Sequence, residues 1–182
     1  RVAAAGWSAE LESSLPVPPS VMKNAWHKIV ESAEAHYQPG TFTSLIGWEW
    51  SSVPGGANLH RVVITDANAE TAKSFQPFAS VDSPYPEDLW AWLDRTAAET
   101  GAEFLAIPHN SNISKGVMFP IESLRGEPIG ADYAAIRMRW ERIVEATQIK
   151  GDSETHPLLS PDDEFADFEE YPFYIQQQPE PY

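Results

Sequence analysis

The sequence has 182 residues, a formal net charge of −15 at pH 7 and no cysteine. This length suits one domain, or a piece of a larger one, with enough apolar side chains for a core. Nucleic-acid binders concentrate Lys and Arg, so the negative charge argues against a nucleic-acid partner. The lack of cysteine excludes disulfides, thiolate nucleophiles and cysteine zinc sites. No apolar run reaches membrane-spanning length, and we expect a soluble protein.

The first part of the chain predicts helix and strand in alternation. We expect an extended, Pro-rich lead-in over 1–19, followed by a helix over 21–36 whose apolar residues recur at helical spacing. A buried strand over 43–50 comes next, and a short strand covers 61–65. Helices and strands joined by short loops are typical of an α/β domain.

The second part of the chain continues this alternation. A helix is expected between Ser83 and Gly101, and a strand over 103–108. A helix over 131–141 and a strand over 142–149 follow. The remaining residues, 160–182, form an acidic, aromatic and Pro-rich tail.

Three residues that commonly bind metals stand next to predicted strands. Glu49 lies near the end of the first strand, His60 directly precedes the second, and His109 directly follows the strand over 103–108. In folds of repeated strand–helix units, ligands gather at the carboxyl ends of the strands. Histidine and carboxylate without thiolate suit Zn²⁺, Mn²⁺ or Fe²⁺. Such a site would activate water and polarise a phosphoryl or carbonyl oxygen.

Each of these residues also has a structural interpretation. Glu49 could pair with a buried arginine such as Arg61, because a lone buried carboxylate is costly. His60 could cap a turn, and His109 could be a surface loop residue. Their spacing is not a ligand signature by itself, so the residues alone leave these alternatives open.

Four segments also carry motifs that resemble those of a known family: Gly47-Trp-Glu-Trp-Ser51, Pro54-Gly-Gly-Ala-Asn-Leu-His60, Leu105-Ala-Ile-Pro-His-Asn110 and Glu145-Ala-Thr-Gln-Ile-Lys150. They resemble a bacterial family known only as a domain of unknown function, family 3604. This family is related to the PHP (polymerase and histidinol phosphatase) superfamily of metal-dependent phosphoesterases. The resemblance covers nearly the whole chain.

The resemblance implies a fold and a ligand set. The fold would be a partial, distorted β/α barrel, TIM-like and of the PHP type, with mostly parallel strands and flanking helices. A multinuclear metal cluster would lie at the carboxyl rim of the strands. Glu49 matches the glutamate of the glycine-x-glutamate motif, while His60 and His109 match the histidines of the next two motifs.

The sequence departs from the superfamily pattern at both ends. Members open with a His-x-His motif and close with an Asp-x-His motif, and neither occurs here. Asp152 and His156 are four positions apart and do not replace the closing motif. We therefore expect residues 1–182 to be a single internal segment of a barrel domain, from a protein of the bacterial cytoplasm or periplasm.

These observations predict a metal-dependent hydrolase that acts on a small, phosphorylated substrate, with Glu49, His60 and His109 as metal ligands and catalytic residues. Lys115 is the one basic residue of its loop and could meet a phosphate oxygen, although it could equally be an ordinary surface lysine. The alternative function is a non-catalytic module that binds a metal or a partner on the same fold. The residues expected to contact the substrate are Asn110, Asn112, Lys115, Asp152 and His156.

Overall fold

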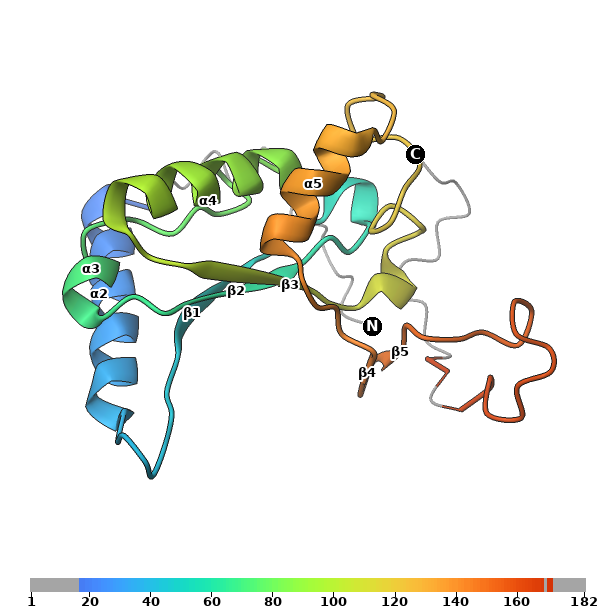
Figure 1. Cartoon of the computed structure of the whole chain (residues 1–182), viewed down its shortest axis with the longest axis horizontal. Coiled ribbons are helices and arrows are strands. Elements are labelled where there is room, and N and C mark those ends of the chain that lie inside the picture. The colour runs from blue at the N-terminus through green and yellow to red at the C-terminus, as the bar shows by residue number, and fades with distance from the viewer. Residues whose placement is uncertain (1–16, 169, 172–182) are drawn as a thin grey trace, which may run out of the picture.

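The computed structural model describes residues 17–168, 170 and 171. Helices and strands are interspersed along the described chain (Figure 1). Predictions for residues 1–16 and 172–182, which cover most of the lead-in and the end of the tail, lie outside the described residues. The elements are α2 (Pro19–His36), β1 (Ile46–Trp50), the 3₁₀ helix η1 (Pro54–Gly56), β2 (Arg61–Thr65), α3 (Ala69–Ala72), α4 (Pro86–Thr100), β3 (Phe104–Pro108), the 3₁₀ helix η2 (Ser111–Ile113), α5 (Ala131–Trp140), β4 (Thr147–Gln148) and β5 (Gly151–Asp152).

Three of the strands form an antiparallel sheet in the order β1-β2-β3. Trp50 lies opposite Arg61 in the first pair, and Arg61 lies opposite Pro108 in the second. The strands β4 and β5 form a separate antiparallel pair. The prediction of mostly parallel strands in a partial, distorted β/α barrel is therefore wrong for the part of the chain that the structure describes.

The path of the chain explains the strand directions. Two neighbouring parallel strands need a crossover connection of about a dozen or more residues. The connection from β1 to β2 consists only of loop residues and the short helix η1. Between β2 and β3 the chain passes along the sheet twice: the segment 73–85 runs back, and α4 then returns to the end where β2 finished (Figure 1). At that end Asp66 N donates to Glu103 O at 3.3 Å. A single helical pass would have made β3 parallel to β2.

Alternation along the strands gives the sheet one buried face and one open face. The helices α4 and α5 cover the buried face (Figure 1), and the hydrophobic core there contains Trp50, Leu59, Val63, Leu89, Trp90, Leu93, Ala102, Phe104, Ala106, Met118 and Trp140. On the open face Val62 is exposed, and Ile64 and Ile107 are half-buried. Glu49 points to this open face, because its register partner is Val62.

Aromatic rings join this core to a smaller cluster under α2, which contains Trp26, Val30, Ile46 and Ala72. The ring of Trp48 lies 5.7 Å from those of Trp26 and Trp92, edge to face in both cases. Edge-to-face pairs at such distances add to the free energy gained by burial. Tryptophan side chains thus fill much of the interior around β1.

A buried ion pair ties the end of α5 to the sheet. The side chains of Arg61 and Glu141 are 1% and 2% exposed, and Arg61 Nε donates to Glu141 Oε1 at 2.9 Å. Trp90 Nε1 donates to the same oxygen at 2.9 Å, and Arg137 Nε donates to Oε2 at 2.9 Å. Both carboxylate oxygens therefore accept hydrogen bonds, as a buried charge requires.

The predicted strand over 142–149 shrinks to the two residues of β4. Ile143 and Val144 are 53% and 50% exposed, so the apolar run that suggested a longer strand is not buried. The segment instead makes a single backbone contact with the end of β3, where Glu145 N donates to Pro108 O at 3.1 Å.

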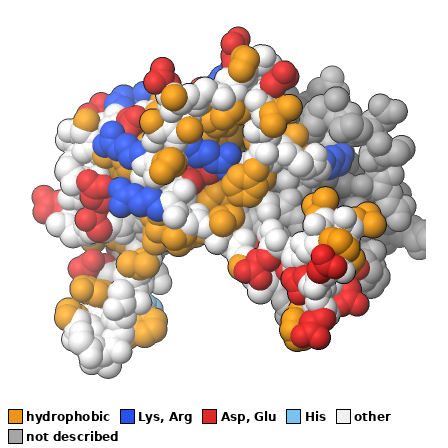
Figure 2. All heavy atoms as spheres, turned by 45° about the vertical axis from the view of Figure 1, so that its right-hand side comes forward, with side chains coloured by type: hydrophobic (Ala, Val, Ile, Leu, Met, Phe, Trp, Pro, Cys, Tyr) orange, Lys and Arg blue, Asp and Glu red, His pale blue; other side chains and the backbone are white. Residues whose placement is uncertain are grey.

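The described part of the predicted tail contains turns. Figure 2 shows acidic and hydrophobic side chains together on the segment that projects at the lower right. In the described part of the tail Phe165 and Phe168 are exposed, as are Leu158 and Leu159 directly before it.

We expect Glu141→Gln to lower the free energy of unfolding by about 3–5 kcal/mol, because it leaves the guanidinium of Arg61 charged and buried without a carboxylate. Urea denaturation followed by tryptophan fluorescence measures the change. Glu31→Gln is the matched control, since it removes an ion pair with Lys73 that is exposed and therefore contributes little to stability. Equal losses in the two variants would contradict the importance of the buried pair.

Candidate metal centre

Glu49, His60 and His109, the Glu–His–His triad, meet at one edge of the sheet. Glu49 is the penultimate residue of β1, His60 directly precedes β2, and His109 directly follows β3. Because the strands are antiparallel, the start of β2 lies beside the ends of β1 and β3, and His109 N donates to His60 O at 3.3 Å. In a parallel sheet the start of β2 would have lain at the opposite edge.

The ligand atoms of the triad lie close together. Glu49 Oε1 is 3.0 Å from His60 Nδ1 and 3.0 Å from His109 Nε2. The candidate ligand atoms of the three residues all lie within 4.8 Å of one another. The two imidazole rings meet at 74° with their centroids 5.6 Å apart, so each presents one nitrogen to the same carboxylate oxygen.

This donor set fits a divalent metal ion. Two imidazole nitrogens and one carboxylate oxygen suit Zn²⁺, Mn²⁺ or Fe²⁺. Three protein ligands also match the pattern of catalytic metal sites, which leave a coordination position free for water or substrate. Glu49 Oε1, His60 Nδ1 and His109 Nε2 are the atoms that would hold the ion.

The surroundings favour the metal-binding forms of Glu49 and His60. Burial raises the pKa of Glu49, but a hydrogen bond with Ser51 and the two neighbouring histidines outweigh it and bring that pKa below its ordinary value. Burial lowers the pKa of His60. The attraction of Glu49 opposes this lowering of the His60 pKa, whereas electrostatic repulsion from the neighbouring His109 and Lys150 adds to it. Ionised carboxylate and neutral imidazole are the forms that bind metal.

Backbone and side-chain contacts position His109. Its Nδ1 lies 3.4 Å from the carbonyl oxygen of Ile107, and Asn58 Nδ2 donates to the carbonyl oxygen of His109 at 2.8 Å. A second contact of this kind commonly orients a metal-binding imidazole. The other histidine differs: His60 Nε2 is buried and has no hydrogen-bond partner among the described residues.

The sequence did not predict the supporting roles of Ser51 and Asn58. Ser51 follows Glu49 by two residues, so strand alternation could have placed the two on one face. Asn58 is 5% exposed and lies in a loop. No local pattern marks a loop asparagine that contacts a residue 51 positions away.

The predicted substrate contacts Asn110, Asn112 and Lys115 lie in the loop after β3. Asn110 is 1% exposed and left-handed, with φ of 54°, and its side-chain amide has no partner among the described residues. Asn112 Nδ2 donates to Lys150 O at 2.8 Å. Lys115 Nζ donates to Gly55 O at 3.1 Å and so ties this loop to η1. Their contacts with a substrate stay predictions.

Asp152 and His156 border a separate cavity of about 270 Å³. Asp152 Oδ1 accepts hydrogen bonds from the backbone N–H groups of Glu154 and Thr155, and His156 Nδ1 accepts one from Leu158 N. These contacts are local, and the candidate metal group contains neither residue. Their predicted role at a substrate is untested.

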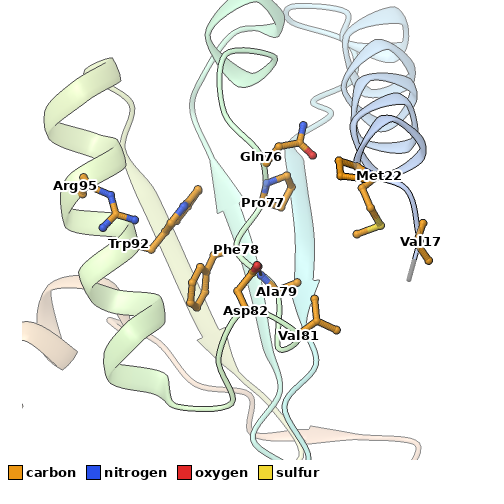
Figure 3. Close-up of a pocket in the computed structure, with 11 residues that line it drawn as sticks. Val17, Met22, Gln76, Pro77, Phe78, Ala79, Val81, Asp82, Trp92 and Arg95 are labelled. Carbon is orange, nitrogen blue, oxygen red and sulfur yellow. Dashed lines mark hydrogen bonds between the residues drawn. The ribbon is translucent and has the colours of Figure 1, made fainter. Parts of the chain in front are cut away.

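Another cavity, of about 470 Å³, lies between the start of α2, the segment 76–82 and α4 (Figure 3). Trp92 and Phe78 stack in its wall with ring centroids 6.2 Å apart. Asp82 and Arg95 are its charged lining residues. No member of the Glu–His–His triad lines it, so we assign it no part in the metal centre.

Fold and site together define a mixed α/β protein with small antiparallel sheets and a glutamate–histidine group that could hold a metal ion. The chain belongs to the family described as Protein of unknown function (DUF3604), whose model matches residues 4–182. The predicted family is thus confirmed, whereas its relation to the PHP superfamily stays a prediction. Comparisons with the curated proteins and with the solved structures return no match.

Within the described residues, no helix has both the length and the apolar character needed to cross a bilayer.

We expect His60→Ala and His109→Ala each to weaken Zn²⁺ binding at least about a hundredfold. Loss of a residue that only supports a ligand typically lowers metal affinity about 10–100-fold, and loss of the ligand itself should lower it further. Isothermal titration calorimetry measures the affinity. His36→Ala is the matched control, since His36 lies on α2, its Nδ1 lies 2.7 Å from the Ser32 carbonyl oxygen, and it is not part of the candidate metal group. Unchanged binding in both site variants would rule out this metal centre.

Gly47 sets the separation of β1 and β2 beside the site. A methyl group here would lie 2.6 Å from Val63 O and 3.0 Å from Ile64 Cγ2. We expect Gly47→Ala to cost about 1–3 kcal/mol of unfolding free energy and to weaken metal binding, because β1 carries Glu49 away from His60. Gly130→Ala is the control, since its new methyl group meets nothing within 4 Å. Paired denaturation and calorimetry test both effects, and a Gly47→Ala protein as stable as the control would refute the argument.

Proposed function

We propose that this protein is a metal-dependent hydrolase that acts on phosphoester bonds of a small molecule. The convergence of Glu49 Oε1, His60 Nδ1 and His109 Nε2 at one sheet edge carries the proposal. A bound Zn²⁺, Mn²⁺ or Fe²⁺ would supply Lewis acidity toward a phosphoryl oxygen and water.

The residues of the chain hold and orient this site. His109 is fixed by contacts with the Ile107 carbonyl and with Asn58, so its Nε2 faces Glu49. Glu49 is 47% exposed, against 20% for His60 and 12% for His109. The solvent side of the triad therefore lies at Glu49, and a substrate would approach from that side.

The choice of a phosphoester rests on sequence. The motifs around Glu49, His60 and His109 match the pattern that we expect of the PHP phosphoesterases, and this expectation supports attack at phosphorus over attack at a carbonyl carbon. The donor set alone would serve either reaction.

We expect the chain, loaded with Mn²⁺ or Zn²⁺, to hydrolyse p-nitrophenyl phosphate or bis(p-nitrophenyl) phosphate. Glu49→Gln and His109→Ala should lower kcat/KM at least about a hundredfold, which corresponds to about 2.7 kcal/mol of lost transition-state stabilisation. Absorbance of p-nitrophenolate measures turnover, and metal analysis accompanies each variant. His36→Ala should match the wild type. Undiminished turnover and metal content in both site variants would refute the enzymatic proposal.

A non-catalytic metal-binding module is the second candidate. It is favoured by the open position of Glu49 and by the two cavities described above, neither of which is lined by the triad. Such a module would lose metal affinity in the same variants. It would differ in showing no metal-dependent turnover of either phosphoester.

A further inference from the structure

Glu145 bonds to the backbone on both sides of His109. It lies in the loop between α5 and β4. Its backbone N–H donates to Pro108 O at 3.1 Å, and its side-chain Oε2 accepts a hydrogen bond from Asn110 N at 2.9 Å. Pro108 and Asn110 are the two chain neighbours of His109. A single residue, 35 positions after Asn110, therefore brackets one of the three candidate metal ligands.

The carboxylate of Glu145 is itself held in place. The side chain of Gln148, in β4, donates from Nε2 to both carboxylate oxygens at 2.9 Å. The pairing of Gln148 with Gly151 in the β4–β5 hairpin fixes the base of this amide. Hydrogen bonds to an ionised carboxylate are stronger than those between neutral groups. The bracket around His109 is therefore a fixed part of the structure.

Asn110 needs support from outside its own side chain. Its φ is 54°, a left-handed conformation that is uncommon for a residue other than glycine. The side-chain amide has no hydrogen-bond partner among the described residues, so it does not hold this conformation. The backbone does: its N–H donates to Glu145, and its carbonyl oxygen accepts from Ile113 N at 3.1 Å and from Asn58 Nδ2 at 3.4 Å. Such backbone geometry persists where the surroundings impose it.

The position of this backbone matters because it carries the imidazole of His109. Nε2 of the ring lies 3.0 Å from Glu49 Oε1, where the metal ion would bind. The contact of its Nδ1 with Ile107 O is long, at 3.4 Å, and a contact of that length orients a ring weakly. The place of Nε2 in the site thus depends strongly on how the chain enters and leaves His109.

We propose that Glu145 is a positioning residue of the metal centre, which holds the backbone on both sides of His109 so that Nε2 meets the metal ion. This inference rests on the proposed function and adds a residue that supports its metal site. Glu145 is not a ligand in this proposal, because the candidate metal group among the described residues consists of Glu49, His60 and His109. Residues that support a ligand in this way typically change metal affinity about 10–100-fold.

The test measures Zn²⁺ affinity by calorimetry and the visible spectrum of the Co²⁺-loaded chain, which reports ligand geometry. We expect Glu145→Ala to weaken Zn²⁺ binding about tenfold and to shift the Co²⁺ bands, because His109 meets the ion at a changed angle. Glu145→Gln keeps an oxygen that can accept from Asn110 N, so it should bind Zn²⁺ nearly as tightly as the wild type. Gln148→Ala, which frees the carboxylate, should shift both readouts in the same direction to a smaller extent.

Asn68→Ala is the matched control. Asn68 Oδ1 also accepts a hydrogen bond from a backbone N–H at 2.9 Å, that of Thr71, and Asn68 is not part of the candidate metal group. This variant therefore loses the same kind of bond as Glu145→Ala, and it should match the wild type in Zn²⁺ affinity and Co²⁺ spectrum.

The possible outcomes separate this inference from the proposed function. A wild-type chain that binds no Zn²⁺ overturns both. Wild-type affinity and spectrum in Glu145→Ala overturn the role of Glu145 alone. Equal losses in Glu145→Gln and Glu145→Ala assign the effect to charge, and an equal loss in Asn68→Ala assigns it to general stability; either result overturns the positioning role. The expected pattern without turnover of either phosphoester supports the role of Glu145 and refutes the hydrolase.

Discussion

Arg61, on the middle strand, reaches beneath the sheet to Glu141, 80 positions later in the chain. A buried guanidinium is costly without its carboxylate, and a shift of one residue in β2 would turn Arg61 to the open face and break the pair. The ion pair therefore fixes the register of β2. That register sets His60 against His109 and places both beside Glu49. The candidate metal centre on one face thus depends on an ion pair on the other.

Local patterns predicted the elements well but not their directions. The helices α2, α4 and α5 and the strand β2 lie where apolar spacing and turn residues predict them. Alternation within a strand is the same whether its neighbours are parallel or antiparallel, so the sequence did not distinguish the two. The segment 73–85 determines the direction of β3, because it runs back along the sheet before α4 and so makes β3 antiparallel to β2. The composition of this segment does not predict that course.

The triad itself was predicted through a rule that does not apply to this sheet. The rule that ligands gather at the carboxyl ends of strands holds for Glu49 and His109. His60 precedes its strand, and it lies beside them only because β2 is antiparallel to β1 and β3. The suggested pair of Glu49 with Arg61 was wrong, since Arg61 lies opposite Trp50 and faces the core. Register and long-range pairs of this kind carry no local signature.

Trp48 and Trp50 stand on either side of Glu49 in β1 and point to the buried face. Trp48 is packed edge to face with Trp26 and Trp92, so a displacement of the strand also changes how these indoles couple to one another. Two indoles thus lie on the opposite face of β1 from Glu49, the candidate carboxylate ligand. We therefore expect the circular dichroism of these indoles to change, without any added label, if an ion that binds at Glu49 displaces β1.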